Sequence, residues 1–576
     1  MAAAPCADHY GDGSEVGAVI LPSWPVQNIS RRKETVSARG LNYSDDFEDG
    51  DLAQCENLSS RRWPYLATRN GRRKLTEYQD VTALSAWNGL VAVRGTDLVY
   101  DGQVVGTVTA GAKQFAAVNT KLVIWPDKVY LDLTDMTVKD LAAKAEATGA
   151  TVAVTEVDRN GYVSYTTTIT FTFAETTDLT TLFKPGDGVE LAGFSHAENN
   201  RALVIKTVET NRITVDSGDF VNETVEPELD TSISTEGEED PVGGAVIVET
   251  EGDPEDYVIK ITMERKVPEM DFICESKNRL WGVSNETKTI YSSALGDPTN
   301  FNVFSGISTD SYALPVATAG DFTGCCKLSS SVLFFKEQVL HRIYGDYPAE
   351  YAMHTTEMEG LRAGCHKSLT IINDALFYVG LHGVFTYAGG TPVDISRIFG
   401  NHVLTEAVGC TDGEKFWLSV LVDGEKGLYV FDPNVGAWLK EDRFRFTDIA
   451  RIGEAVYLLK EDGTVWLADS GEPDRDIDWM LEYAPFYEDT EGQGRKRVTR
   501  LLIRAELEGK AWMAAETRTG PGPKWTEAGK IKGPGEDMIV LNVPPNRGDV
   551  YRVRLRGHGP CTLKNVVREH VRGGDG

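Results

Sequence analysis

Short apolar runs alternate with polar turns along most of this chain, and within the runs the alternation has a period of two residues. The stretch that begins at Val81, VTALSAWNGLVAVRGTDLVYDGQVVGTVT, contains three or four such runs, with Asn88-Gly89, Gly95-Thr96 and Asp101-Gly102 between them. Asn-Gly and Asp-Gly are strong hairpin signals, because both central residues of a type I′ turn need a positive φ. The pattern predicts consecutive antiparallel strands joined by tight turns.

The same form recurs at intervals of roughly 35–50 residues, which is the spacing of propeller blades. Each unit ends in a strand that carries an aromatic residue: Tyr100, Tyr130, Tyr291, Tyr344, Tyr387, Tyr429 and Trp466. A propeller protects its sheet edges by radial repetition of small sheets. We therefore expect a mainly β protein built on a β-propeller of about six or seven blades. A string of β-sandwiches is the alternative.

The repeating pattern of strands and turns is interrupted between residues 141 and 266. LAAKAEATGA at 141–150 predicts a short helix, and YVSYTTTITFTFAE at 162–175 alternates as a strand does. The following stretch, 183–216, predicts further strands with turns at Gly186-Asp187-Gly188 and Asn199-Asn200. We expect an inserted small β-barrel-like domain at 141–266, which divides the propeller into 81–140 and 267–475.

The chain is strongly acidic, with a formal net charge of −29. Residues 208–256 alone hold sixteen Asp or Glu and one Arg. A charge run of this kind is usually a solvated face or loop, and the functional alternatives are a repulsive lining or a mobile loop at a tip. Such acidity argues against a protein that grips DNA, because gripping needs Lys and Arg at the phosphates. It is compatible with a surface along which DNA slides.

Residues 1–80 differ from the rest by having few strand runs and several basic clusters. The acidic stretch DDFEDGD lies among them at 45–51. We expect an extended N-terminal docking arm, because Trp24, Trp63 and Tyr65 are too apolar for a disordered tail. Arginine and aromatic residues are favoured at interfaces. The candidate contact residues are Arg61, Arg62, Trp63, Arg72 and Arg73.

Residues 476–576 predict a C-terminal β-sandwich-like domain, because their runs alternate strongly. Arginines recur on these runs: Arg497, Arg500, Arg504, Arg552, Arg554 and Arg556. Residues at i, i+2 and i+4 of a strand share one face of the sheet. This face is either simply solvated or an inter-subunit surface that meets an acidic neighbour.

Catalytic motifs are missing from the sequence. It holds no G-x-S-x-G, H-E-x-x-H, Walker A or dinucleotide fingerprint. EDGTVWL at 461–467 lacks the Ser and the spacing of a sialidase repeat, and its Asp-Gly is explained as a hairpin turn. The eight Cys show no zinc-type spacing. We expect no enzyme activity, no cofactor and no metal.

Targeting signals are also missing. The first residues, MAAAPCADHYGDGSE, have no basic start and no apolar core of a signal peptide. No apolar run approaches the roughly 18–20 residues that a membrane helix needs. We expect a soluble protein that is not exported by a cleavable signal and does not insert into a membrane.

Two long stretches resemble one family. Residues 278–304, NRLWGVSNETKTIYSSALGDPTNFNVF, continue into STDSY at 308–312, GDFTGCC at 320–326 and VLFFKEQVLHRIYGDYPAEY at 332–351. Together with GLNYSDDFEDGDLAQCENLSSRRWPYLATRNGRR at 40–73, they are similar to the tail nozzle or tail-hub proteins of short-tailed bacteriophages, also described as DNA stabilisation proteins. The segment 141–266 departs from the shorter members of that group.

The resemblance implies a structural virion protein that forms a ring, expected to be a hexamer, below the portal and the head-to-tail adaptor. Such a ring closes the DNA channel and lets DNA pass on infection. The implied partners are other copies of the chain, the adaptor, other tail proteins, and DNA that passes through the lumen without specific binding. The implied location is the virion tail, after assembly in the bacterial cytoplasm.

Two other functions remain open from the residues. The first is a propeller-type receptor-binding tail protein, an adhesin, whose carbohydrate platform the segment 141–266 could carry. The second is a hydrolase of the propeller class, because abundant carboxylates could include a catalytic pair.

Overall fold

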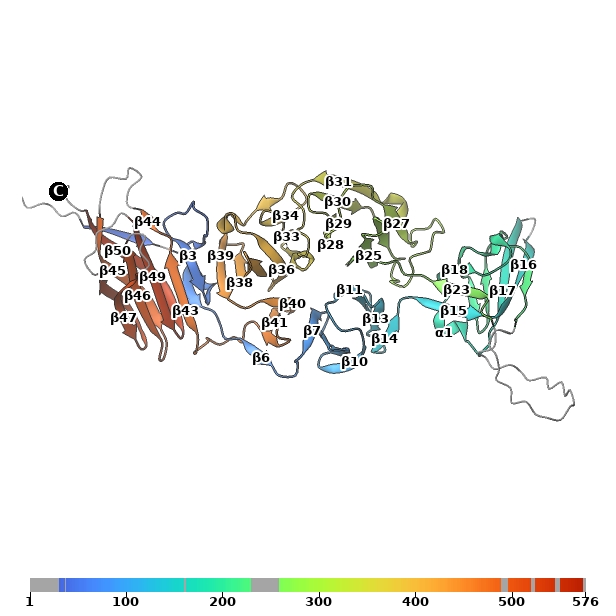
Figure 1. Cartoon of the computed structure of the whole chain (residues 1–576), viewed down its shortest axis with the longest axis horizontal. Helices are drawn as coiled ribbons and strands as arrows, with labels where there is room; N and C mark the ends of the chain where they lie inside the picture. Colours follow the sequence, from blue (N-terminus) through green and yellow to red (C-terminus); the bar gives the residue numbers. More distant parts are fainter. Residues whose placement is uncertain are drawn as a thin grey trace, which may run out of the picture.

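A computed structural model describes residues 31–36, 38–159, 162–228, 258–487, 496–519, 524–543 and 550–572 of this protein. The described residues form three blocks in a row: a two-sheet block near the C-terminus, a ring of small sheets, and a separate small block formed by the middle of the chain (Figure 1). The expected acidic segment lies largely outside the description, because residues 229–257 are not part of it.

Seven four-stranded antiparallel sheets make up the ring in the described residues. In chain order they are β7–β10 (Val81–Ala86, Leu90–Arg94, Asp97–Tyr100, Gln103–Thr107), β11–β14 (Gln114–Val118, Lys121–Trp125, Val129–Asp132, Thr137–Asp140), β24–β27 (Phe272–Ser276, Arg279–Ser284, Thr289–Ser292, Tyr312–Pro315), β28–β31 (Gly324–Leu328, Ser331–Phe335, Val339–Tyr344, Ala352–Glu357), β32–β35 (Thr370–Ile372, Ala375–Val379, Val384–Tyr387, Val393–Asp394), β36–β39 (Leu404–Thr411, Phe416–Val422, Glu425–Asp432, Ala437–Asp442), and β40–β42 (Phe446–Ile452, Ala455–Lys460, Val465–Leu467) with β6 (Arg73–Leu75).

Neighbouring sheets of the ring share buried cores. The first two sheets pack together through residues such as Val93 and Leu122, and every later sheet shares a cluster with the next. The last sheet packs against the first through Leu459 and Leu84. The sheets therefore close into a propeller-like ring, and the prediction of a mainly β, propeller-like protein is confirmed.

The predicted turns form where the sequence places them. Asp101 and Gly102 both have a positive φ, of 46° and 81°, and link β9 to β10 as a two-residue hairpin turn does. In the stretch 278–304, β25 and β26 pair with Val283 opposite Ile290. Both observations follow from local residue patterns.

The N-terminal segment closes the ring and builds the C-terminal block. β6 pairs with β42, with Leu75 opposite Val465, so a strand from near residue 75 completes the last sheet. The expectation of few strands in residues 1–80 is wrong, because β1–β6 all lie there. They are β1 (Arg31–Val36), β2 (Gly40–Leu41), β3 (Asp51–Glu56), β4 (Leu58–Arg62), β5 (Tyr65–Thr68) and β6.

The C-terminal block consists of two packed sheets. One joins β1, β4 and β5 to β45 (Lys496–Leu507), β48 (Gly535–Asn542) and β50 (Cys561–Arg572). The other joins β2 and β3 to β43 (Asp478–Tyr483), β44 (Phe486–Tyr487), β46 (Trp512–Thr519), β47 (Thr526–Lys532) and β49 (Val550–His558). Their inner faces share one core, which continues into the ring.

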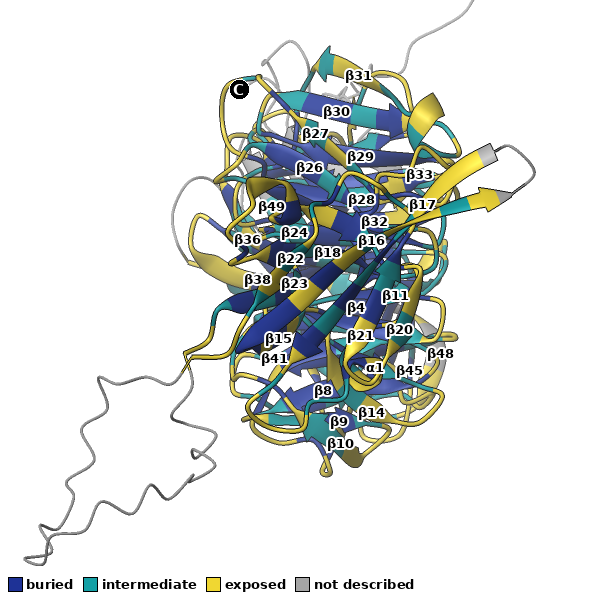
Figure 2. Ribbon diagram, turned by 90° about the vertical axis from the view of Figure 1, so that its right-hand side faces the viewer, coloured by how far each residue is buried: buried dark blue, intermediate teal, exposed yellow. Residues whose placement is uncertain are grey.

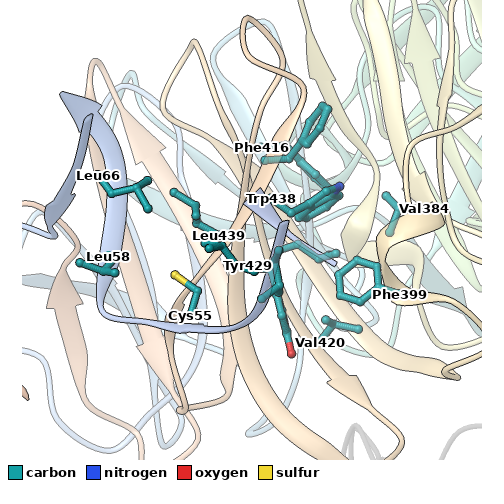
Figure 3. Packing of buried hydrophobic residues seen from close by; sticks show 14 of the residues in the cluster. Cys55, Leu58, Leu66, Val384, Phe399, Phe416, Val420, Tyr429, Trp438 and Leu439 are labelled. Atoms are coloured by element: carbon teal, nitrogen blue, oxygen red, sulfur yellow. The ribbon is translucent and has the colours of Figure 1, made fainter. Parts of the chain in front are cut away.

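Figure 3 shows this continuity: Cys55, Leu58 and Leu66 of the N-terminal strands lie beside Leu439 and the other labelled residues of the ring. All of them are buried. The ring and the C-terminal block are therefore held together by a common apolar core, and the N-terminal strands are part of it.

The inserted block has its own core of residues between 145 and 263. Its sheets are formed by β15 (Ala143–Ala147), β18 (Gly188–Ala192), β19 (Ala202–Val204) and β23 (Ile261–Arg265), and by β16 (Gly149–Arg159), β17 (Tyr162–Thr172), β20 (Thr207–Glu209), β21 (Arg212–Val215) and β22 (Glu223–Val225), with one short helix, α1 (Leu179–Leu182). Figure 2 shows the exposed end of the β16–β17 hairpin projecting from it.

The helix predicted at 141–150 is wrong. Ala145 and Ala147 are buried at alternate positions of β15, which pairs with β23 more than a hundred residues later. The helix-favouring alanines are thus overridden by pairing with a strand that is distant in sequence.

Candidate functional site

The five predicted contact residues do not form one surface. Arg61, Arg62 and Trp63 lie where β4 turns into β5 in the C-terminal block. The Arg61 Nε donates a hydrogen bond to the Thr68 carbonyl oxygen at 2.8 Å. Arg62 is exposed, and its Nη1 lies 3.7 Å from Glu506 Oε2. Trp63 is half-buried against the common core.

Arg72 lies in the joint between the ring and the C-terminal block. Its side chain is only 7% exposed and forms an ion pair with Asp442, which is 6% exposed. Its guanidinium lies 5.5 Å from the centre of the Phe446 ring. Arg73, the next residue, is exposed on β6. Arg72 is therefore buried and pairs within its own chain. This corrects the prediction that it contacts another protein.

The charges around Arg72 form a compact buried cluster. The Arg69 Nη1 lies 3.4 Å from Asp474 Oδ2, and its Nε donates to Asn57 Oδ1 at 3.0 Å. Burial lowers the pKa of Arg72 to about 9. Burial also raises the pKa of Glu441, while Arg72 opposes that rise. The cluster ties the N-terminal segment to the last two sheets of the ring.

The sequence analysis did not identify Glu441, Asp442, Arg69 or Asp474. Asp442 and Asp474 are separated from their arginine partners by about 370 to 405 positions. No local spacing relates such residues. The one available signal is the mixed charge at the end of β39, where Glu441 and Asp442 follow an apolar run.

A cavity of 220 Å³ lies beside this cluster. It is lined by Arg69, Arg72, Asp442, Phe444, Phe446, Lys460, Trp466 and Asp474. Lys460 lies 4.0 Å from the centre of the exposed Phe444 ring and 3.2 Å from Asp462. Most of the charges that line this cavity are thus already paired within the chain.

A second cavity, of 330 Å³, lies at the centre of the ring. Its lining comes from the innermost strands of the sheets, for example Ser85, Gln114, Ile273, Cys325 and Asp448. At about 30 Å³ per water, it holds on the order of ten water molecules. It is therefore too small to pass a DNA duplex.

The charged groups of the central cavity also have partners. Asp448 accepts a hydrogen bond from the Leu84 backbone N–H at 3.1 Å and forms an ion pair with Lys367. Lys113 lies 2.7 Å from Asp127. Burial raises the pKa of Asp448, an effect that Lys367 opposes. These contacts tie the last sheet to the first one and to the segment that precedes β32.

His366 lines the same central cavity. Its ring centre lies 5.2 Å from that of Phe272, and burial lowers its pKa to about 4. Within the described ranges, no group of three or more His, Cys, Asp or Glu is arranged to hold a metal ion. The charged groups that line the central cavity are therefore paired within the chain.

A third cavity, of 690 Å³, lies between the sixth sheet of the ring and the C-terminal block. Tyr43, His402, Asp423 and Lys440 are among its lining residues. The His402 Nδ1 lies 2.6 Å from Asp423 Oδ2, and the Lys440 Nζ lies 5.5 Å from the Tyr429 ring centre. Its charges are of both signs.

The arginine ladder of the C-terminal block separates into two sheets. Arg552, Arg554 and Arg556 lie on β49 and contact buried glutamates of the neighbouring strands. Arg554 and Arg556 lie 2.5 Å and 2.8 Å from Glu516, and Arg552 lies 3.3 Å from Glu482. Their acidic partners therefore lie in the same chain, and not in a neighbouring subunit as the inter-subunit interpretation expected. Arg500 and Arg504 lie on β45, in the other sheet.

Comparisons with known proteins give no family. No protein-family model and no curated protein match the chain. Among solved structures, it is similar to BamB from Moraxella catarrhalis (TM-score 0.22, 13% identity, 35% of this chain and 72% of that one). It is also similar to the extracellular domain of the putative one-component system BT4673 from B. thetaiotaomicron (TM-score 0.27, 11% identity, 88% and 86%). An exo-β-1,3-galactanase from Phanerochaete chrysosporium gives a TM-score of 0.21 at 7% identity (50% and 93%).

Similarities at these TM-scores carry no functional argument, and the assignment of the fold rests on the sheets described above. The described residues contain no helix with the length and apolar character that a membrane span requires.

Proposed function

We propose that this protein is a structural component of a tailed-bacteriophage virion, a subunit of a ring that closes the DNA channel and lets DNA pass on infection. The proposal includes the finer fold: a seven-bladed β-propeller, an inserted small β domain at 141–266, and a C-terminal β-sandwich to which the N-terminal strands belong. It assigns the protein no catalytic activity.

The main support is the placement of the residues that carry the resemblance to tail proteins. In the stretch 40–73, the Asn42 Nδ2 donates to Asp51 Oδ2 at 2.8 Å, and the Asn57 Nδ2 donates to the Asp478 carbonyl oxygen at 2.8 Å. In the stretch 278–304, the fully buried Arg279 donates to three backbone carbonyls of one loop. These residues hold the framework together, as a structural protein requires.

The size of the central cavity bears on the path of the DNA. Because that cavity is too small for a duplex, the channel in this proposal lies between subunits, where several copies surround it. A surface with a net charge of −29 per copy repels phosphate, so DNA slides along such a lumen without being held.

The direct test is a phage in which the gene for this protein is deleted. The proposal expects particles with empty or leaking heads, because the channel stays open after packaging. Stable DNA-filled particles in normal numbers would contradict it. Complementation with the intact chain controls for effects on neighbouring genes.

A receptor-binding role is the second candidate, and one observation favours it. The inserted block carries a groove of 510 Å³, lined by Tyr165, Asp216 and Asp219 among others, in which Tyr165 is 44% exposed. Exposed aromatic rings beside carboxylates suit the apolar faces and hydroxyls of a sugar.

A deletion of the insert distinguishes the two functions. Ala143 and Arg265 lie directly opposite each other in β15 and β23, so a short Gly-Ser linker can bridge the two ends that remain when residues 144–264 are removed. An adhesin loses adsorption but still yields DNA-filled particles. A channel-closing ring without a receptor-binding insert keeps its adsorption.

A further inference from the structure

The outer face of the C-terminal block carries a strip of arginine and apolar residues. Along β45, Leu501 and Ile503 point into the core and are fully buried, whereas Arg500 and Arg504 at the alternate positions are exposed. Within the part of the chain that the structure describes, neither arginine has an ion pair, a side-chain hydrogen bond or a ring partner. Their charges are therefore available to another molecule.

Two apolar side chains adjoin these arginines on the next strand. Met538 and Val540 of β48 are 53% and 47% exposed. Met538 lies opposite Arg504, and Val540 lies opposite Leu502. β48 is the last strand of its sheet, and an edge strand with an apolar outer face invites pairing or docking. Methionine and arginine are both enriched in protein interfaces.

The same block carries free negative charge at its other edge. β2 is the end strand of the second sheet, and the loop from β2 to β3 contains Asp45 and Asp46. Both are exposed, and neither carboxylate has a partner among the described residues. Other acids of this loop are engaged, as Asp49 is by Arg568.

The topology places the strip and the loop apart. In the second sheet β2 and β47 are at opposite ends. β48 follows β47 after two residues and packs against it, because Leu541 fills the space over Gly529. One copy can therefore present the strip to one neighbour and the acidic loop to another.

We propose that the arginine–apolar strip (Arg500, Arg504, Met538 and Val540) of one copy docks on the acidic loop (Asp45 and Asp46) of the next copy. A two-fold contact between two strips would place arginines against arginines, and such like-charge contacts are costly. The contact is therefore heterologous, and heterologous contacts generate rings when their rotation closes. This inference rests on the proposed function, for which it names the subunit interface.

The test is the assembly state of the purified full chain, measured by light scattering and negative-stain imaging over a range of concentrations. The variants are R500E/R504E, D45K/D46K and the combination of all four substitutions. R451E is the control, because Arg451 is an exposed arginine of β40 in the propeller-like ring that has no ion pair among the described residues. A fourth variant, M538Q/V540T, removes the apolar part without a charge change. All substituted side chains are exposed in the single chain, so folding is preserved.

We expect R500E/R504E and D45K/D46K each to raise the apparent dissociation constant of the ring of subunits about tenfold or more, because each places like charges together at the contact. The variant with all four charge reversals recovers assembly, M538Q/V540T weakens it, and R451E leaves it unchanged. Rings that persist in both charge reversals would overturn this interface while the proposed function stands. A chain that stays monomeric and is missing from the particle would overturn both.

Discussion

The buried pair of Arg72 and Asp442 gives a quantitative test of the joint between the ring and the C-terminal block. Both side chains are more than 90% buried, and Glu441 lies fully buried nearby. Removing one partner of a buried ion pair leaves an uncompensated charge and costs about 3–5 kcal/mol. We therefore expect R72M to lower the free energy of unfolding by about that amount.

A double-mutant cycle isolates the pair. In the wild type the Phe444 backbone N–H donates to Asp442 Oδ1 at 2.9 Å. D442N removes the charge of this side chain but keeps an oxygen that can accept the same hydrogen bond. The double variant R72M/D442N is expected to lose less than the sum of the two single losses, because neither charge is then left alone. Urea titration followed by tryptophan fluorescence gives the energies, and hydrogen exchange over residues 68–75 and 442–446 localises them.

The matched control is Arg62, which is also in the N-terminal segment. Its pair with Glu506 is 41% and 36% exposed, so R62M is expected to cost less than about 1 kcal/mol. The reasoning is refuted if R72M costs no more than R62M, or if the double variant loses the full sum.

Three further predictions concern other parts of the molecule. Burial lowers the pKa of His341 and of His366 to about 4. Above the unfolded pKa of about 6.5 the neutral histidines cost no stability, and as the pH drops from there to 4 the free energy of unfolding falls by up to about 3 kcal/mol for each histidine. Thermal melts of H341Q/H366Q should therefore show a flatter pH profile than those of the wild type. R279M should loosen the loop at 293–310, whose carbonyls Arg279 binds, and limited proteolysis should then cut the chain there while the wild type resists. G193A should destabilise the inserted block by several kcal/mol, because Gly193 has φ of 101° and a Cβ would lie 1.7 Å from the Lys260 oxygen; equal melting of the wild type and the variant would contradict this.

The sequence predicted the repeated strands well because their causes are local. The Asp101-Gly102 turn and the pairing of β25 with β26 depend on residues next to each other in the chain. The prediction failed where distant partners decide. Ala145 and Ala147 lie in a strand because β23 pairs with β15, although a run of alanines by itself favours a helix.

For the charged cluster around Arg72, the sequence could predict the types of residue involved but not their partners. Arginine and tryptophan near the N-terminus indicated a segment that docks on a neighbouring copy or on the adaptor, whereas Arg72 and Trp63 contact Asp442 and the common core of their own chain. The sequence could not show this, because the partner of Arg72 lies about 370 residues away. For the arginines of β49 the sequence left a solvated face or an inter-subunit surface open, and the structure pairs them instead with Glu516 and Glu482 of the same block.

The most direct test of the central claim is electron microscopy of intact particles, with an affinity tag on this chain labelled by gold. A ring-forming tail component predicts label at the tail vertex of each particle and a closed ring of copies in the averaged image of that vertex. Particles without label at the tail, or label on an isolated single copy with no ring, would contradict the claim.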